Sequence, residues 1–412
     1  MDLLRARRLV LAAAVVGLAL RLAFGFLYWT GKPLTHDERE YLALAGSLRE
    51  GRGLRYPAGY DTGTAQQFGR APGYPAFLAA IGAGTPAEAP PPRVKVVQSV
   101  LGAMAVWMIG ALAWRAAGPR AGAIAAALAA IYPPLVWISA YVLSEALYIP
   151  LALGCVLLLA GARSRADAER SIRAGGALVV AAGLVAGVAI LVRPGMLFYL
   201  PIVAAWLILR RRWSLALAFC IAAAVVVAPW TLRNIREYDR FVLVATEGGV
   251  TFWTGNHPLA IGEGDLAANP AIKADEIAFR RSHPGLSAAE LEPLYYRAAL
   301  AQIADRPGWW LVLLARKLFY TFVPIGPSYT LHSTRYLLAS VVPYTLLAPL
   351  AFIGLFRLTR RGSGATPLLL LALSVVVTSL VFFPQERFRI PVIDPTIIVC
   401  ASVVLAGMRS RP

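Results

Sequence analysis

Apolar stretches about 20 residues long recur along most of this 412-residue chain and constrain its fold more than any other feature. A helix of that length is what crosses the hydrocarbon core of a bilayer. With 58% apolar residues and a mean hydropathy of +0.63, the chain is too hydrophobic for a single soluble domain. We therefore predict an all-α polytopic membrane protein with about ten transmembrane helices, at residues 9–29, 94–114, 120–138, 141–162, 174–192, 195–209, 213–231, 335–356, 365–383 and 390–408.

The arginines are sorted by side of the membrane. Basic residues far outnumber acidic ones in the short connections, which hold Arg5, Arg7, Arg8, Arg115, Arg120, Arg163, Arg165, Arg170, Arg173, Arg210, Arg211, Arg212, Arg357, Arg360, Arg361, Arg409 and Arg411. By the positive-inside rule, both termini are expected to be cytoplasmic. Topology thus accounts for the net charge of +18, and no nucleic-acid partner is expected.

Two predicted extracytoplasmic segments, 30–93 and 232–334, are too long to be simple connections. In the first, Thr35 and Glu38 form a capping-box pattern ahead of an apolar stripe, which predicts a helix over 36–50 on the membrane surface. A second short helix is expected after Pro72, and the Pro-rich stretch 86–92 returns the chain to the bilayer.

The second long segment repeats the capping-box pattern at Ser287 and Glu290, which predicts a helix ending near Asp305. Another helix is expected over 309–323. At about 22 Å it is short of the roughly 30 Å hydrocarbon core, so we place it in the outer interface, with Arg316 and Lys317 facing the lipid headgroups. No internal repeat divides the chain, and 1–412 is interpreted as a single membrane domain.

Asp37 and Glu38 are the leading candidates for chemistry, because they form a carboxylate pair at the predicted outer face. Acids in the first turn of a helix are also favoured by its macrodipole, without any catalytic role. Adjacent carboxylates point in different directions from a helix. One can therefore act as a base while the other orients it, binds a metal or contacts a second substrate.

Several cations are predicted near the same face and could bind phosphate, although each could instead anchor lipid headgroups. They are Arg193, Arg233, Arg316, Lys317, Arg387 and Arg389. Glu145, at the outer end of a predicted span, is a further candidate because carboxylates near hydrocarbon are costly and tend to be functional. Asp394 lies deeper and has no role that the sequence suggests.

A series of short motifs resembles bacterial membrane glycosyltransferases of the GT-C fold, most nearly the family 39-like enzymes related to protein O-mannosyltransferases and to the aminoarabinose transferase of lipid A. The resemblance extends from the first predicted span to the last. The motifs are Asp37-Glu38-Arg39-Glu40-Tyr41, Arg70-Ala71-Pro72-Gly73-Tyr74-Pro75, Leu143-Ser144-Glu145, Arg193-Pro194, Pro229-Trp230-Thr231-Leu232-Arg233-Asn234, Gly255-Asn256-His257-Pro258 and Glu386-Arg387-Phe388-Arg389-Ile390-Pro391.

The resemblance implies roles for individual residues. Asp37 takes the position of the catalytic base, with Glu38 as its partner, and Arg387 and Arg389 contact the phosphate of a polyprenyl-phosphate sugar donor. Arg233 is placed at the mouth of the site. Tyr41 and His257 lie in the same motifs and are further candidates. The resemblance also implies the bacterial inner membrane, with an extracytoplasmic active site.

The chemistry of these residues is consistent with an inverting glycosyltransferase. Phosphate is already a good leaving group, so the donor needs cations, whereas the acceptor hydroxyl needs a base. The chain is shorter at its C-terminus than better-known relatives, so a glycan, a lipid or a protein could be the acceptor. No cofactor is certain, although His36, Asp37, Glu38 and His257 could bind a divalent metal. The alternatives are a polymerase or ligase of lipid-linked glycans, and a transporter of lipids or solutes.

Overall fold

The computed structural model describes residues 2–57, 60, 69–85, 87–167, 172–264, 269–326, 333–360 and 364–407. Every regular element among these residues is helical, which confirms the all-α expectation. The charge pattern is only partly covered: Arg170, Arg361, Arg409 and Arg411 lie outside the described residues, as does Pro86, and the side chains of Arg163, Arg165 and Arg173 are not described.

Six helices in the described part of the chain are long and apolar enough to cross a membrane. They are α1 with its π-helical continuation (Leu3–Tyr28), α4 (Pro92–Ala117), the Glu145–Ala162 part of α7 (Glu145–Asp167), the Gly175–Val192 part of α8 (Ile172–Val192), α10 (Trp213–Tyr238) and α15 (Thr334–Arg360). Four shorter apolar helices match the remaining predicted spans: α5 (Pro119–Ile131), η2 with α9 (Pro194–Leu209), α16 (Thr366–Val381) and α18 (Ile393–Leu405). The number of crossings therefore stays a prediction.

Several of the predicted span boundaries were wrong by a few residues or more. The predicted span 120–138 is divided, because Pro133 starts a separate short helix, α6 (Pro133–Trp137), after α5 has ended. A proline favours the first turn of a helix, since it has no backbone N–H to lose there. Residues 138–144 are not α-helical, so α7 begins at Glu145 instead of at 141, and α10 continues past 231 to Tyr238.

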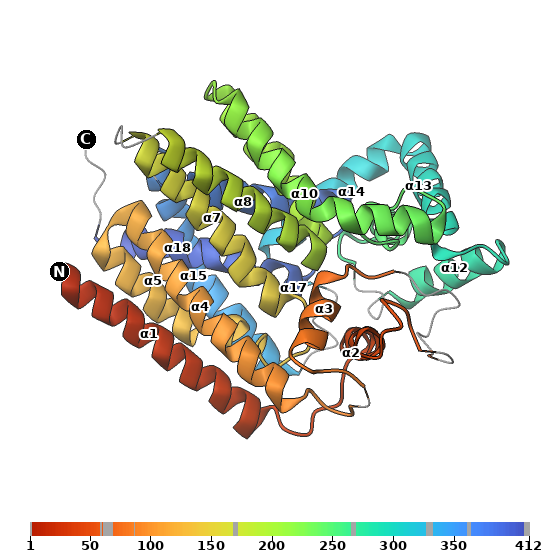
Figure 1. Cartoon of the computed structure of the whole chain (residues 1–412), viewed down its shortest axis with the longest axis horizontal. Helices are drawn as coiled ribbons and strands as arrows, with labels where there is room; N and C mark the ends of the chain where they lie inside the picture. The colour runs from red at the N-terminus through yellow and green to blue at the C-terminus, as the bar shows by residue number, and fades with distance from the viewer. Residues whose placement is uncertain are drawn as a thin grey trace.

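The long helices lie side by side as a bundle, and the helices of the two long connecting segments gather at one end of it (Figure 1). α1 begins at the opposite end of this bundle, and α18 finishes there too, so the chain enters and leaves on the same side. Small residues allow close packing inside the bundle. A Cβ on Gly110 of α4 would lie 3.2 Å from the Gly122 carbonyl oxygen of α5.

In the first long segment, α2 (His36–Arg49) begins with the expected capping box, and α3 (Gly73–Ala80) follows. The side chain of Thr35 accepts from the Glu38 backbone, and that of Glu38 accepts from the Thr35 backbone. The expectation of a surface helix with one apolar face was wrong, because consecutive residues from Leu42 to Ser47 are all buried. α2 is therefore enclosed by protein on most sides, which fixes the direction of its first turn.

The second long segment folds into a separate helical unit with its own small core. It contains α11 (Gly248–Gly255), α12 (Pro270–Arg281), α13 (Ala288–Asp305) and α14 (Pro307–Phe322). Trp253, Ile272, Leu291, Tyr295 and Leu313 form the centre of that core. The capping box at Ser287 and Glu290 is present, as expected. α14 matches the predicted short helix, and its Arg316 side is exposed.

Candidate active site

Asp37 is held between two arginines that come from distant parts of the sequence. Arg70 Nη2 donates to Asp37 Oδ1 at 3.0 Å, and Arg387 Nη1 donates to Oδ2 at 2.6 Å. Arg70 lies just before α3, and Arg387 lies on α17 (Glu386–Arg389), a single turn between α16 and α18. The fold therefore brings three of the resemblance motifs together on one carboxylate, at the end of the bundle where α2, α3 and α17 meet (Figure 1).

The charges around Asp37 control its protonation. Burial raises the pKa of the carboxyl, but the attraction of Arg387 and Arg70 outweighs burial and holds the pKa well below its usual range. Asp37 is consequently ionised at neutral pH. A proton acceptor must be ionised to act, and it becomes more basic when a neighbouring cation is withdrawn.

Arg70 is the centre of a network that the sequence reasoning missed. Besides Asp37, its guanidinium binds Glu40 through Nε at 2.9 Å and Glu247 through Nη1 at 3.0 Å. Thr246 and Gly69 exchange two hydrogen bonds, from Gly69 N to Thr246 Oγ1 at 2.6 Å and from Thr246 N to Gly69 O at 3.0 Å. These contacts join the first long segment to the start of α11.

A spacing signal could have found Glu40, whereas none pointed to Glu247. Glu40 follows Asp37 by three residues on a predicted helix, so the two carboxylates share a face. Glu40 also accepts from Tyr56 Oη at 3.0 Å and is buried. Glu247 belongs to none of the recognised motifs, and only the fold brings it to Arg70.

A second ion pair lies beside the first. Arg193 Nη1 contacts Glu145 Oε1 at 2.6 Å, and Glu145 is buried at the start of α7. Both Arg193 and Arg387 approach the ring of Phe388: the Cζ of Arg193 is 4.9 Å from the ring centre, and that of Arg387 is 5.4 Å from it. Two guanidinium groups therefore share contact with a single aromatic ring, and one of them also pairs with the Asp37 carboxylate.

Tyr41 packs against this cluster from α2. The guanidinium carbon of Arg70 lies 5.6 Å from its ring centre, and the ring of Tyr74 meets it edge to face at 4.9 Å. Burial raises the pKa of Tyr41 to about 12, so the phenol stays neutral at physiological pH. Tyr41 can therefore donate a hydrogen bond at the site, but it cannot act as a base.

Glu38 is in a structural position and does not face the cluster. Its Oε2 accepts from Thr35 N at 2.8 Å, and its Oε1 accepts from Val142 N at 2.8 Å. The side chain is 1% exposed. The structure does not bring Glu38 to the carboxylate of Asp37, with which we expected it to act, and the reason is geometric. Neighbouring helical side chains diverge, and that of Glu38 points into the bundle, where it fastens the 138–144 segment to α2.

Arg389, expected at the donor phosphate, likewise does not reach the Asp37 cluster. Its Nε contacts Asp394 Oδ1 at 2.9 Å, and its guanidinium carbon lies 4.0 Å from the ring centre of Tyr344. Both Arg389 and Asp394 are buried. This inward ion pair supplies the role for Asp394 that the sequence did not suggest. Because Arg387 and Arg389 lie on opposite sides of one turn, only Arg387 reaches the cluster.

Lys317 is not at the headgroups, where we expected it, but inside the outer helical unit. Its Nζ donates to Asn256 Oδ1 at 2.9 Å and to the Leu380 carbonyl oxygen at 3.1 Å. Burial lowers the pKa of Lys317 to about 7. Both of these partners are neutral groups, and neither belongs to the Asp37 cluster. Lys317 therefore joins α14 to the end of α16 and lies apart from the candidate phosphate site.

His257 and Arg233 also lie outside the direct contacts of Asp37. His257 is buried in the second core, where its Nε2 is 3.5 Å from Asp275 Oδ2 and its ring packs on Trp253. The guanidinium of Arg233 stacks over the Trp230 ring at 4.8 Å and lies 3.8 Å from Glu237. His257 therefore has a packing position, and Arg233 borders the second long segment.

One group among the described residues has the ligand types of a metal site: His36, Asp37 and Glu40, whose ligand atoms lie within 4.8 Å of one another. An imidazole and two carboxylates suit a divalent ion. However, Arg70 Nη2 already contacts Asp37 Oδ1 and Glu40 Oε2. As arranged, these residues do not fit a metal, because a guanidinium holds the oxygens that a metal would need. Glu38 and His257, the other ligands considered, are not part of this group.

Solved structures place this arrangement in a known fold. The oligosaccharyltransferase of Archaeoglobus fulgidus in its apo form has a TM-score of 0.59 and 16% sequence identity, covering 98% of this chain and 50% of that chain. AglB of the same organism, in complex with an inhibitory peptide and a dolichol-phosphate, has a TM-score of 0.57 and 14% identity, with coverages of 98% and 50%. ArnT from Cupriavidus metallidurans, bound to undecaprenyl phosphate, has a TM-score of 0.44 and 15% identity, covering 95% of this chain and 77% of that chain.

The chain has the GT-C fold, as the motif resemblance implied. It spans about half the length of the oligosaccharyltransferases it matches. No family model matches the chain, and no curated protein sequence matches it. At these identities the likeness shows the fold alone, so a function has to be argued from the site itself.

Proposed function

We propose that the protein is a membrane glycosyltransferase that moves a sugar from a polyprenyl-phosphate-linked donor to an acceptor at the extracytoplasmic face of the bacterial inner membrane. The observation that carries this proposal is the Asp37 carboxylate shared by Arg70 and Arg387, with the Arg193–Glu145 pair alongside. This site joins one accessible base to cations able to bind phosphate, which is the combination that glycosyl transfer from a phosphate requires.

The transfer uses these residues in a single displacement. Asp37 accepts the proton of the acceptor nucleophile as that atom forms its bond to the anomeric carbon. The bond from the anomeric carbon to the donor phosphate oxygen breaks, and its electron pair stays on the phosphate. Cationic side chains compensate the charge that develops there. Because one displacement occurs at the anomeric carbon, its configuration inverts.

The cations differ in how free they are to bind a substrate. Arg70 already contacts three carboxylates, so its charge is more than neutralised and its position is fixed. Arg387 has one close carboxylate partner, Asp37, and its side chain is 37% exposed. We therefore assign donor-phosphate binding first to Arg387 and second to Arg193. When Arg387 turns to the phosphate, Asp37 Oδ2 is released to accept a proton.

Transfer of a longer glycan is the second candidate, since the solved proteins of this fold include an oligosaccharyltransferase. It would use the same base and cations, and only the mass of the product separates it from single-sugar transfer. Transport is less well supported. Transporters place ionisable groups near the bilayer midplane between repeats, whereas this cluster lies at the end of the bundle.

The proposal is tested with purified full-length protein and polyprenyl-phosphate sugars extracted from bacterial membranes. Product mass and anomeric configuration are followed by mass spectrometry and NMR. Asp37→Asn keeps the shape but removes the basicity, so its turnover should fall at least about 100-fold. Glu50→Gln is the matched control, because Glu50 is an exposed acid at the other end of α2 that pairs with Arg52. Wild-type turnover by Asp37→Asn, or loss of turnover in both variants alike, would refute the assignment.

A further inference from the structure

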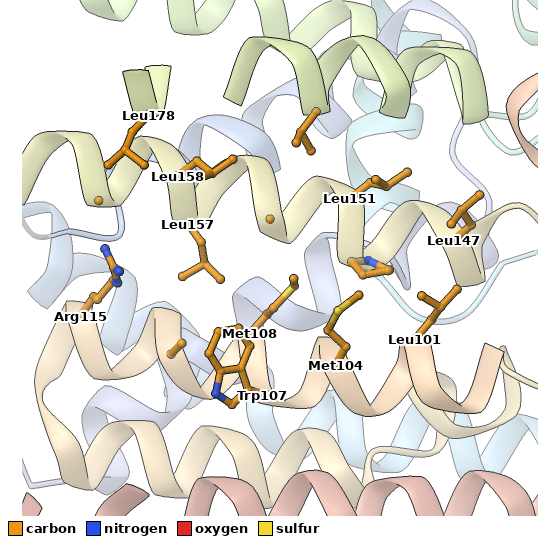
Figure 2. A pocket seen from close by; sticks show the side chains of 15 residues that line it. Leu101, Met104, Trp107, Met108, Arg115, Leu147, Leu151, Leu157, Leu158 and Leu178 are labelled. Atoms are coloured by element: carbon orange, nitrogen blue, oxygen red, sulfur yellow. The ribbon is translucent and has the colours of Figure 1, made fainter. Parts of the chain in front are cut away.

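An apolar groove of about 810 Å³ runs between α4, α7 and α8 (Figure 2). Its walls are formed mainly by leucine and methionine side chains, and Arg115 is the one charged residue among those that line it. Leu101 and Leu147 lie at one end of the groove, and Arg115 lies at the other. From Leu101 to Arg115, α4 rises about 21 Å, which is longer than one leaflet of the hydrocarbon core.

Missing side chains on α7 create the groove. Gly154 and Gly161 both face it. A Cβ on Gly154 would meet only Met108 Cε, at 3.7 Å, so there is room above the backbone at this point. A Cβ on Gly161 would lie 3.2 Å from Arg115 Nη1, so the guanidinium packs directly against the α7 backbone at this glycine. Trp107, at the rim of the groove on α4, is exposed, so the groove opens towards the lipid.

Arg115 is an exposed cation at one end of this groove. It lies in the last turn of α4, and within the part of the chain that the structure describes its side chain has no hydrogen bond or ion pair. In the topology predicted by the arginine distribution, this end of α4 is cytoplasmic. Basic side chains between helices at that level attract anionic lipid headgroups.

We propose that the groove binds one anionic glycerophospholipid of the cytoplasmic leaflet. Its phosphate pairs with Arg115, and an acyl chain lies along α4 and α7 towards Leu101. The positive charge of Arg115 favours an anionic glycerophospholipid in the groove over the tail of a polyprenyl-phosphate donor. The proposed donor site adjoins the opposite end, where Leu147 follows Glu145 by two residues, and none of the described lining residues there is charged. This inference does not depend on the proposed glycosyltransferase activity.

Native mass spectrometry of the full-length protein tests the site. Delipidated protein is titrated with phosphatidylglycerol or phosphatidylcholine in mixed micelles. Wild type should retain one phosphatidylglycerol, and Arg115→Gln should weaken that binding at least about tenfold, the loss expected for a hydrogen bond to a charged group. Gly154→Leu should reduce binding of both lipids, because its side chain fills the groove. Arg120→Gln is the control, since Arg120 is an exposed arginine near the same end that does not line the groove.

Two results would overturn the proposal. Equal retention of phosphatidylglycerol by Arg115→Gln, Arg120→Gln and wild type would mean that the lipid is held by nonspecific attraction. Displacement of the lipid by polyprenyl phosphate, to the same extent in wild type and in Arg115→Gln, would assign the groove to the donor tail. A parallel thermal melt identifies any variant that fails to fold. In that case Arg115→Lys, which keeps the charge and should retain most of the binding, gives the comparison instead.

Discussion

At the scale of single residues, the balance of charge around Asp37 decides what the site can do. The carboxylate and its two arginines come from α2, from the residues before α3 and from α17, so none of them is at the site through local sequence alone. Arg387 is the exchangeable member, because Arg70 is held by Glu40 and Glu247 as well. In the proposed transfer, a substrate phosphate that draws Arg387 away would raise the basicity of Asp37 and bind the donor in one step.

The pH dependence of kcat/KM, which reflects ionisations of the free protein, should report the pairing of Asp37 with Arg387 and Arg70. Because Arg387 and Arg70 hold the pKa of Asp37 well below its usual range despite burial, the ionised form persists to unusually low pH. The stabilisation from these pairs is present above the unfolded-state pKa of about 3.9 and is lost as pH falls through the lower folded-state pKa. Arg387→Gln should move the acid limb of kcat/KM to higher pH, and an unchanged limb would mean that Asp37 is not the titrating base.

Glu38 should affect stability instead of chemistry. Glu38→Gln weakens the charged acceptor for Thr35 N and Val142 N, so the free energy of unfolding should fall by about 1–3 kcal/mol. Turnover by the folded variant, measured below its melting temperature, should stay near that of wild type. A loss of turnover as large as that of Asp37→Asn, without a change in melting temperature, would restore Glu38 to the reaction.

At the scale of elements, the single turn α17 places its residues by alternating them between two environments. Arg387 faces Asp37, the ring of Phe388 packs near the guanidinium groups of Arg193 and Arg387, and Arg389 points inward to Asp394. A four-residue helix has little intrinsic stability, so its orientation depends on such anchors. The buried Arg389–Asp394 pair therefore fixes the direction of Arg387.

Replacing the two arginines of α17 should give different results. Arg389→Ala leaves Asp394 buried without its partner, which should lower the free energy of unfolding by about 3–5 kcal/mol. Arg387→Ala should leave the melting temperature nearly unchanged. It should raise the donor KM or lower kcat, and the resulting loss in kcat/KM should correspond to about 1.5–3 kcal/mol. Thermal unfolding and donor kinetics on the same preparations measure both. Normal donor kinetics in Arg387→Ala would move the phosphate site to Arg193.

At the scale of the whole molecule, the fold separates a membrane bundle from a polar end that carries the site. The long helices form the bundle, and α2, α3 and α11–α14 collect at the end away from the beginning of α1 (Figure 1). The two large segments are joined there by Arg70 and by the Gly69–Thr246 hydrogen bonds. A donor carried in the membrane would therefore meet the Asp37 carboxylate and its arginine partners at that end.

The orientation of the bundle in the membrane can be tested by cysteine labelling. In a variant with Cys220→Ala, an Asp305→Cys residue should react with an impermeant thiol reagent from outside, and Arg360→Cys should react only after the membrane is opened. Both positions are exposed, and the remaining Cys155 and Cys400 are buried. Labelling of both Asp305→Cys and Arg360→Cys in intact cells would mean that α14 crosses the membrane, whereas labelling of Arg360→Cys alone would reverse the predicted orientation.

The sequence by itself determined where the long apolar helices lie and which connections between them are basic. Apolar length, proline position and capping boxes act over a few residues, so α2, α13 and α14 could be located from local pattern alone. The family motifs also identified Asp37 and Arg387 as members of one site. Local sequence patterns could not predict their direct contact, because 350 positions separate the two residues.

Tertiary structure alone decided which member of each motif faces the site. Adjacent side chains in one turn point to different environments, so Asp37 and Glu38 separate, and so do Arg387 and Arg389. Whether a turn presents one residue or its neighbour depends on packing against segments that are distant in the sequence. Glu247 could not be predicted from the sequence, because it belongs to no motif. It becomes part of the site only because the fold brings it into contact with Arg70.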